Sequence, residues 1–367
     1  MPESPLLPRL DPSLIESELK DLWGRIARET AGSEEEVLRA CVLNLVVCSD
    51  PDGEVDQLAS DLAASGESWS GRLILLVVDE ESAGDGFDAR VSAHCQRQKG
   101  GREQICGEII RIMAVGEAVS RSASVVAPLV VPDLPVFLWW RRSIDPDAAL
   151  LQRLARMTDR LIVDSARQGV DDLSAVSSLV ALDVEWTVSD LAWARLQLWR
   201  RSLAGLYDSA LTREVLTRPT GVHLEFGGHL PNEVIYLLSW LAGRLNWELR
   251  SSIVETDTGY RVDARAGDAN FGIELDRAPG NGLCRVQLSA AGHLTVDVER
   301  RRSSGSLLEI RVECQGRRIS HQVLPGTSQR EIELLATELE IPQRDRVFQE
   351  ALAFASRLRY LQDAAPE

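Results

Sequence analysis

The chain has 367 residues, 44% of them hydrophobic and 26% charged, which is typical of a globular protein long enough for two domains. Its 56 acidic and 40 basic side chains give a formal net charge of −16. This charge disfavours nonspecific binding to nucleic acid or to anionic membranes, because both require clustered cations. We therefore predict a protein with no nucleic-acid partner and no membrane partner.

The sequence shows no sign of export or membrane insertion. It begins without a cationic segment followed by an apolar one, and prolines interrupt the longest apolar run, residues 125–140. Six cysteines are scattered without a CxxC pair or a zinc-like spacing. These features predict a cytoplasmic protein that binds no metal.

The first predicted elements lie in residues 1–35, an N-terminal arm followed by a helix from Asp11 to about Glu29. Residues 36–172 then alternate strand and helix patterns. The runs Ala40–Cys48 and Arg72–Asp79 are almost continuously Val, Leu and Ile, which is typical of strands buried on both faces. This part of the chain predicts an α/β domain with a mostly parallel sheet.

Two further strands are predicted over Ala89–Gln98 and Gln104–Val115, with a hairpin turn around Gly100-Gly101. Such a hairpin would place Cys95 opposite Cys106. Two alternatives stay open for this candidate redox pair. The cysteines form a disulfide that acts as a redox switch, or both remain free thiols, as a reducing compartment favours.

Residues 173–367 have a different pattern. A Trp-rich helix is predicted over residues 186–210, and short strand patterns separated by turns such as Gly280-Asn281-Gly282 follow it. The tail, residues 328–361, predicts two helices broken at Ile341-Pro342. Together these patterns predict an α+β domain with an antiparallel sheet, the Trp-rich helix and C-terminal helices.

Catalytic motifs are missing from the sequence. We find no glycine-rich phosphate loop, no GxSxG and no HExxH, so no catalytic residue and no cofactor is predicted. His223, His229 and Glu225 are the nearest approach to a metal or acid–base set. At this spacing, histidines more commonly face solvent or form ordinary hydrogen bonds than bind a metal or act as an acid or base.

The most unusual segment runs from Pro132 to Arg142. Two prolines bracket Asp133, which predicts a loop leading into a short buried strand. Tandem tryptophans and an arginine pair follow; Trp and Arg dominate interface hot spots, although they also pack on ordinary surfaces. We expect at least one of the two tryptophans to lie in the core. The candidate partner-binding residues, here and on the Trp-rich helix, are Asp133, Trp139, Trp140, Arg141, Arg142, Trp193, Arg195, Arg200 and Arg201.

Three segments resemble the glucose-6-phosphate dehydrogenase assembly protein OpcA family, in their order and separation. They are residues 131–141 (VPDLPVFLWWR), 159–165 (DRLIVDS) and 190–200 (DLAWARLQLWR). The resemblance covers roughly residues 12–361 and is closer to the cyanobacterial branch. It implies a non-catalytic protein that associates with glucose-6-phosphate dehydrogenase, promotes its active oligomer and so acts as an allosteric activator of the oxidative pentose phosphate pathway. The dehydrogenase, rather than this chain, would then bind NADP. The resemblance also implies a link between this family and redox state, which draws attention to the cysteines without identifying a pair.

Two alternatives compete with this interpretation. The chain is an α/β enzyme acting on a sugar phosphate, with His229 or an aspartate in a cleft, or it is a small-molecule sensor without a partner enzyme. Turnover by the chain alone would support the first alternative. A shift in thermal stability with pathway metabolites would support the second.

Overall fold

The computed structural model describes two compact units within one chain. The described residues are 6–7, 9–30, 36–52, 55–64, 70–97, 103–166, 172–182, 186–301, 307–326, 330–341 and 344–363. Unit 1 comprises Met1–Asp164, Leu182–Ser189 and Leu335–Pro342, and unit 2 comprises Ser165–Ala181, Asp190–Leu334 and Gln343–Glu367. Within these described ranges, no helix combines the length and the apolar character needed to span a membrane.

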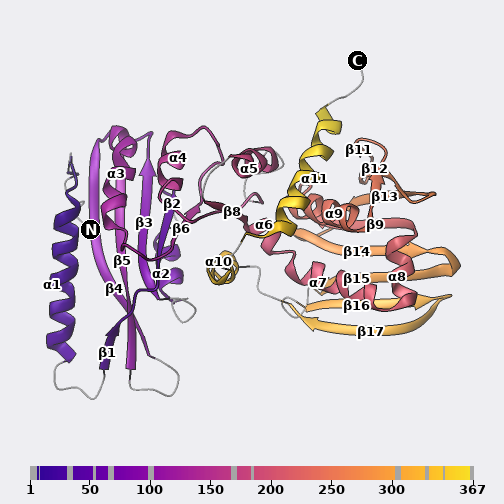
Figure 1. Cartoon of the computed structure of the whole chain (residues 1–367), viewed down its shortest axis with the longest axis horizontal. Helices are drawn as coiled ribbons and strands as arrows, with labels where there is room; N and C mark the ends of the chain where they lie inside the picture. The colour runs from indigo at the N-terminus through magenta and orange to yellow at the C-terminus, as the bar shows by residue number, and fades with distance from the viewer. Residues whose placement is uncertain are drawn as a thin grey trace. The chain divides into compact units, whose positions relative to one another are not determined.

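Unit 1 is built on an eight-stranded sheet with the order β1-β5-β3-β2-β6-β7-β8, in which β4 also pairs with β5 (Figure 1). The β1–β5, β5–β3, β3–β2, β2–β6 and β6–β7 pairs are parallel, and β4 is antiparallel to β5. Strands β2 and β6 are buried along their whole length, as their continuous apolar runs predict. The predicted mostly parallel sheet is therefore confirmed. The strands are β1 (Glu36–Arg39), β2 (Leu43–Ser49), β3 (Gly71–Asp79), β4 (Gly86–Arg97), β5 (Glu103–Val115), β6 (Val136–Trp140), β7 (Arg160–Val163) and β8 (Thr187–Asp190).

The order of these strands reverses at the centre of the sheet. From β2 the chain proceeds through β3 to β5 on one side, and it then returns to β6 and proceeds through β7 to β8 on the other side. The predicted hairpin is confirmed by the β4–β5 pair, while its expected turn at Gly100-Gly101 lies outside the described residues. The helices that belong to unit 1 are α1 (Pro12–Thr30), α2 (Val55–Ala64), α3 (Ser122–Val126) and α4 (Ala149–Ala155).

A buried carboxylate joins α1 to this sheet. Glu108 of β5 accepts a 2.8 Å hydrogen bond from Nε of Arg72 on β3 and a 2.6 Å bond from the indole of Trp23 on α1. Arg39 of β1 lies 2.6 Å from the same carboxylate, and Arg72 also pairs with Glu16 of α1. The side chains of Arg72 and Glu108 are 4% and 3% exposed, so each charge depends on the other for compensation.

Unit 2 contains a nine-stranded sheet with the order β10-β12-β13-β9-β14-β15-β16-β17, and β11 also pairs with β12. Most pairs are antiparallel, as predicted, but β13 is parallel to β9. The reason is that a helix, α9, follows β9 and carries the chain across before β13 pairs with it. The strands are β9 (Pro219–Gly227), β10 (Trp247–Leu249), β11 (Val254–Glu255), β12 (Gly259–Ala266), β13 (Ala269–Arg277), β14 (Gly282–Ala290), β15 (Leu294–Arg301), β16 (Leu307–Cys314) and β17 (Arg317–Pro325).

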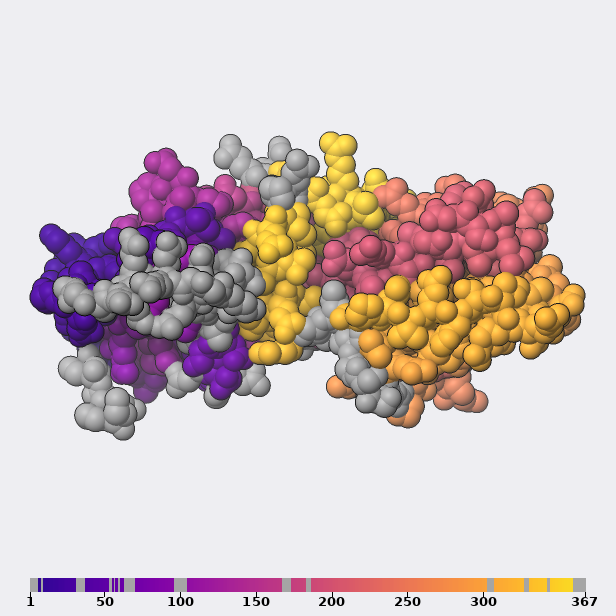
Figure 2. All heavy atoms as spheres, turned by 90° about the horizontal axis from the view of Figure 1, so that it is seen from below, coloured from indigo at the N-terminus to yellow at the C-terminus, as the bar shows by residue number. Residues whose placement is uncertain are grey.

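Helices cover one face of the unit 2 sheet. In β9, the buried residues Val222, Leu224 and Phe226 alternate with the partly exposed His223 and Glu225. Helix α8 contacts β9, β14 and β15, and α9 contacts β14, so the apolar face lies under these helices. In the space-filling view, the amber atoms of β16 and β17 lie at the surface (Figure 2). The remaining helices are α5 (Asp172–Ala181), α6 (Leu191–Ala194), α7 (Gln197–Gly205), α8 (Ala210–Thr217), α9 (Asn232–Leu245), α10 (Glu331–Glu340), which contributes to both units, and α11 (Arg346–Asp363).

The prediction of one long helix over residues 186–210 was wrong. Residues 187–190 form β8, and the helical part is divided into α6 and α7. Asp190 explains the boundary, because its backbone is extended and its Oδ1 atom accepts hydrogen bonds from the amides of Ala192 (2.9 Å) and Ser165 (3.1 Å). An extended Asp that caps the next turn begins a helix rather than continuing one.

Replacing Glu108 with Ala should destabilise the protein by about 3–5 kcal/mol, because it leaves the buried Arg72 guanidinium without its buried partner. The free energy of unfolding from denaturant titration measures this change. Glu18 is an exposed acid on α1, and Glu18→Ala should change stability by no more than about 0.5 kcal/mol. Equal effects of the two substitutions would show that the Glu108 contacts do not stabilise the fold.

Candidate functional site

The segment from Pro132 to Arg142 is fixed by hydrogen bonds from two other strands. The Asn44 side chain on β2 donates to the Val131 carbonyl (3.0 Å) and accepts from the Val131 amide (2.8 Å). The carboxylate of Asp159, at the start of β7, accepts from the Val136 amide (2.7 Å). Asp133 has a positive φ of 64°, a conformation that Asp tolerates better than most residues. The segment therefore has a defined structural role at the entry to β6.

Both tryptophans of this segment are core residues. Trp139 is 0% exposed and Trp140 is 2% exposed, which confirms the expectation that at least one of them is buried. The Trp140 indole donates to the Ser143 carbonyl (2.9 Å), and the buried Arg141 guanidinium lies 5.0 Å from the centroid of the Trp139 ring. In the folded chain these three side chains therefore support a surface rather than form one.

The carboxyl ends of β2, β3 and β6 meet at one edge of the unit 1 sheet. There Arg142, which follows β6, forms ion pairs with Asp50 after β2 (Nε–Oδ1, 2.6 Å) and with Glu80 after β3 (3.1 Å between Nη1 and Oε1). In open α/β sheets this edge, at the point where the strand order reverses, is where dinucleotides and other ligands bind. In this chain these ion-paired side chains lie at that edge.

The second group of candidate residues lies in an aromatic cluster of unit 2. Trp193 of α6 is 3% exposed, and its indole donates to the Asp345 carboxylate (2.8 Å). The Arg200 guanidinium lies 3.6 Å from the Trp193 ring centroid. Tyr236 donates to Oδ2 of Asp190 (2.7 Å), and burial together with this carboxylate raises the pKa of Tyr236 well above its ordinary value. The segment 190–200 thus owes much of its composition to internal packing.

The candidate partner-binding residues differ in exposure. Asp133 and Arg201 are exposed, Arg142, Arg195 and Arg200 are partly exposed, and the remaining four are buried. Asp133, Trp139, Trp140, Arg141 and Arg142 belong to unit 1, where Asp133 and Arg142 lie at opposite ends of β6, and Trp193, Arg195, Arg200 and Arg201 belong to unit 2. Their role in binding a partner stays a prediction.

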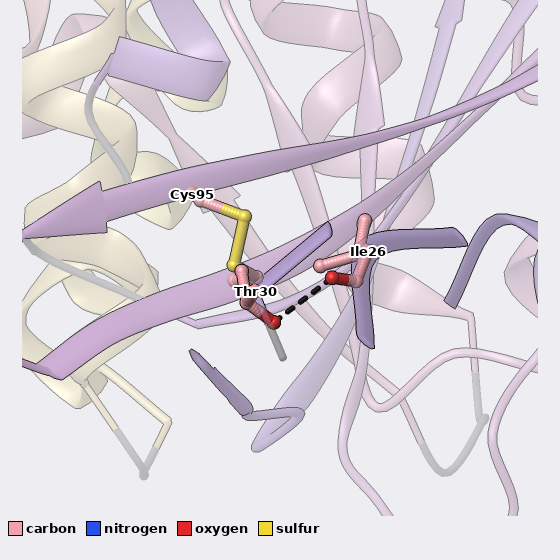
Figure 3. Close-up of a disulfide and its surroundings, with 4 residues drawn as sticks. Ile26, Thr30 and Cys95 are labelled. Atoms are coloured by element: carbon pink, nitrogen blue, oxygen red, sulfur yellow. Dashed lines mark hydrogen bonds between the residues drawn. A yellow bond between two sulfur atoms is a disulfide. The ribbon is translucent and has the colours of Figure 1, made fainter. Parts of the chain in front are cut away.

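Cys95 and Cys106 are directly opposite each other on β4 and β5 and form a disulfide, with 4.0 Å between their Cα atoms. Of the two alternatives that the sequence left open, the structure thus contains the bonded pair. Figure 3 shows the disulfide beside Ile26 and Thr30, in the last turns of α1. Cys106 is fully buried and Cys95 is partly exposed. A switching role of this disulfide stays a prediction.

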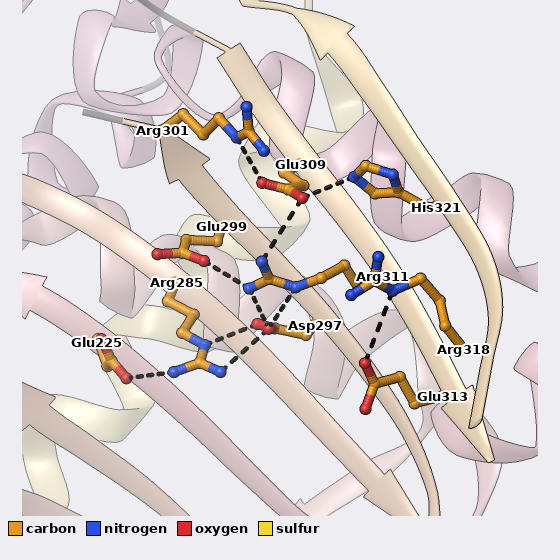
Figure 4. Close-up of polar contacts among 10 residues, drawn as sticks. All are labelled: Glu225, Arg285, Asp297, Glu299, Arg301, Glu309, Arg311, Glu313, Arg318 and His321. Carbon is orange, nitrogen blue, oxygen red and sulfur yellow. Dashed lines mark hydrogen bonds and ion pairs between the residues drawn. The ribbon is translucent and has the colours of Figure 1, made fainter. Parts of the chain in front are cut away.

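A charged network that the sequence patterns did not predict lies on the face of the unit 2 sheet opposite to the helices. Asp297 of β15 lies at its centre, 2.7 Å from Arg285 of β14 and 2.7 Å from Arg311 of β16. Burial alone would raise the pKa of Asp297, but hydrogen bonds from the two guanidinium groups outweigh it, and the pKa is lowered. Alternating charges along β15 and β16 were the available signal. Figure 4 shows the polar contacts of this face, which involve Glu225, Arg285, Asp297, Glu299, Arg301, Glu309, Arg311, Glu313, Arg318 and His321.

The histidines considered as a metal or acid–base set do not converge. His223 lies 2.8 Å from the Asp276 carboxylate, Glu225 pairs with Arg285, and His229 is exposed. Among the described residues, no group of three or more His, Cys, Asp or Glu side chains is placed to hold a metal ion. The positions of these residues therefore do not support the alternative of an enzyme that uses them.

Two family models match successive parts of the chain. Residues 63–180 match the OpcA model described as the glucose-6-phosphate dehydrogenase subunit N-terminal domain. Residues 186–352 match the model described as the C-terminal domain of the same subunit. An α/β unit and an α+β unit in this order thus define the class, and the chain belongs to the OpcA family.

Relatives from cyanobacteria agree with this assignment. The OxPP cycle protein OpcA of Nostoc punctiforme is 34% identical over 167 residues, which is 45% of this chain and 36% of that protein. The OpcA protein of Synechocystis is 31% identical over 202 residues, 54% of this chain and 41% of that one. The matched segments therefore span less than half of each relative. Among solved structures, a dehydrogenase from Clostridium difficile has a TM-score of 0.45 at 13% identity, with 87% of this chain and 99% of that chain covered.

The disulfide gives a testable thiol count. Of the six cysteines in the sequence, four are free in the structure, so denatured protein purified without reductant should titrate four thiols, and reduction should raise the count to six. Cys95→Ser should titrate five thiols before and after reduction, because Cys106 then has no partner. A count of six in the untreated wild-type protein would contradict the bonded pair.

Asp297→Asn should lower stability by about 1–3 kcal/mol at pH 7, because two guanidinium groups lose a charged acceptor. The lowered pKa of Asp297 means that the carboxylate contributes stability above its ordinary value of 3.8, and that this contribution is lost as the pH falls below that value. The variant should therefore lose less stability than the wild type between pH 7 and about pH 3. The exposed Asp268→Asn is the matched control, and identical pH profiles for all three proteins would refute the role of Asp297.

Proposed function

We propose that this chain is a non-catalytic partner of glucose-6-phosphate dehydrogenase. It binds the enzyme, favours its active oligomer and thereby acts as an allosteric activator in the oxidative pentose phosphate pathway. Membership of the OpcA family supports the choice of partner. One structural observation supports the non-catalytic role: the ion pairs of Arg142 with Asp50 and Glu80 occupy the edge where an α/β sheet ordinarily binds its ligand.

The loop after β2 gives the physical reason. Pyrophosphate binding at this position requires backbone amides, close approach to glycine and the positive end of a helix. In this chain β2 is followed by Asp50, Pro51 and Asp52, which supply two carboxylates and a residue without an amide hydrogen. A dinucleotide would meet negative charge at this loop, so we assign NADP binding to the dehydrogenase.

Activation requires differential affinity. The chain must bind the active state of the enzyme more tightly than the inactive state, and a tenfold preference corresponds to about 1.4 kcal/mol. We assign the direct contacts to the candidate residues that are exposed or partly exposed, namely Asp133, Arg142, Arg195, Arg200 and Arg201. The buried tryptophans hold these positions in place, since a rigid scaffold reduces the entropy lost on binding.

Arg142→Ala and Arg201→Ala should each weaken activation of the purified dehydrogenase, by about tenfold in the concentration required. The measurements are the KM of the enzyme for glucose 6-phosphate and its oligomeric state, with and without the chain. Arg25→Ala, an exposed cation on α1, is the matched control. Thermal unfolding must show that each variant remains folded, because Arg142 also holds Asp50 and Glu80.

The same experiment separates the competing functions. Turnover of a sugar phosphate by the chain alone would identify an enzyme and overturn the proposal. A chain that neither binds the dehydrogenase nor changes its KM would overturn the choice of partner. Normal activation by both variants would leave the partner intact and place the contact surface elsewhere.

A further inference from the structure

The two edges of the unit 2 sheet differ in length and accessibility. One edge consists of the short strands β10 and β11, with three and two residues. The other edge is β17, which has nine residues and pairs only with β16 within the described part of the chain. The outer backbone amides and carbonyls of a long edge strand can accept another strand, and proteins usually shorten or cover such edges.

The side chains of β17 are also unusually accessible. None of its nine residues is buried, and the apolar side chains of Ile319 and Val323 are 52% and 43% exposed. In Figure 2 its amber atoms are at the surface of the molecule. His321 lies midway between these two residues, so strand alternation places all three side chains on the same face. An apolar pair on a long open edge is suited to a second strand that covers it.

The sequence of β17 is self-complementary. We propose that β17 pairs with β17 of a second copy of this chain, antiparallel, about a two-fold axis at His321. In this register Ile319 of each copy is opposite Val323 of the other copy, which forms two apolar cross-strand pairs. The pairing of β17 with β16 shifts register between Ser320 and Arg318, so the regular overlap of the two strands runs from Ile319 to Val323.

Other symmetric registers fit less well. If Ile319 faces itself, the overlap of residues 317–321 includes the irregular part of the strand, and if Val323 faces itself, residues 321–325 overlap. Each of these registers also leaves the other apolar residue without an apolar partner. Of these three registers, the one centred on His321 is thus the one that gives two matched apolar pairs.

Charge is compatible with this pairing although the chain as a whole is acidic. β17 contains Arg317 and Arg318 and no carboxylate. Neither arginine faces a like charge in this register, since Arg318 is opposite Leu324. The two copies of His321 face each other, and each lies 2.6 Å from the carboxylate of Glu309 on its own sheet. Because the net charge of −16 opposes association at long range, added salt should strengthen the dimer.

A two-fold dimer also has a consequence for the proposed function. Each dimer would present every enzyme-binding surface twice, related by symmetry. Two linked surfaces can hold two enzyme subunits together, which is the kind of contact that promotes an oligomer. The dimer itself is tested without the dehydrogenase, so its failure and the failure of the proposed function are distinguishable.

The test is site-specific cross-linking of the full chain. The background replaces the partly exposed Cys41, Cys284 and Cys314 with Ser. In this background His321→Cys places two thiols on the two-fold axis, and mild oxidation should give a covalent dimer on a non-reducing gel. Ser320→Cys is the matched control, because its side chain points to the opposite face and its counterpart is displaced along the strand. It should cross-link at least about tenfold less.

A second measurement uses chain without added cysteines. Sedimentation of the wild type between about 1 and 100 μM should show a dimer that grows with concentration and with salt. The double variant Ile319→Lys and Val323→Lys should remain monomeric and folded, because both residues are on the surface. A monomeric wild type, equal cross-linking at residues 320 and 321, or an unchanged dimer in the double variant would each overturn the proposal.

Discussion

Much of unit 1 depends on the buried carboxylate of Glu108. Helix α1 and strands β1 and β3 all place a side chain on it, so one charged group connects elements that are far apart in sequence. A buried charge of this kind stabilises only the arrangement that satisfies all its partners. Cys106 precedes Glu108 by two residues on β5, and therefore points to the same face of the strand. Figure 3 shows its disulfide near the end of α1, so a change at Cys95–Cys106 would act on the same helix as the Glu108 contacts.

Most residues of the segments that resemble the family stabilise the fold and do not form an exposed surface for a partner. Asp159 holds the entry to β6, Asp190 ends β8 and begins α6, and the tryptophans of both segments are buried. Such residues are constrained by several neighbours at once, which makes them a recognisable signature without placing them at an interface. Partner contact requires accessible side chains, and the charged residues next to these buried positions have them. A signature and a binding surface can thus occupy one segment and consist of different residues.

Sequence alone was sufficient where one local rule decides the structure. The continuous apolar runs of β2 and β3 predicted a parallel sheet, and the spacing of Cys95 and Cys106 predicted a facing pair. Sequence alone was insufficient where residues far apart in the chain determine the local structure. The Trp-rich segment was predicted as one helix because helical periodicity does not reveal that Asp190 is extended and bonded to Ser165. The charged network around Asp297 also needed strand pairing, since Arg285 and Arg311 meet this carboxylate only after three strands align.

The charged face and the β17 edge of unit 2 differ in whether their polar groups already have partners within the protein. On the charged face, Asp297 and Glu309 are already bonded to cations of the same sheet, so an incoming protein would have to replace interactions that are satisfied. At the edge, the outer backbone groups of β17 have no partner strand within the described chain, so a new strand would replace hydrogen bonds to water and break none within the sheet. Association through the edge therefore disrupts fewer interactions within the protein. This difference favours edge pairing for contact between two copies of the chain.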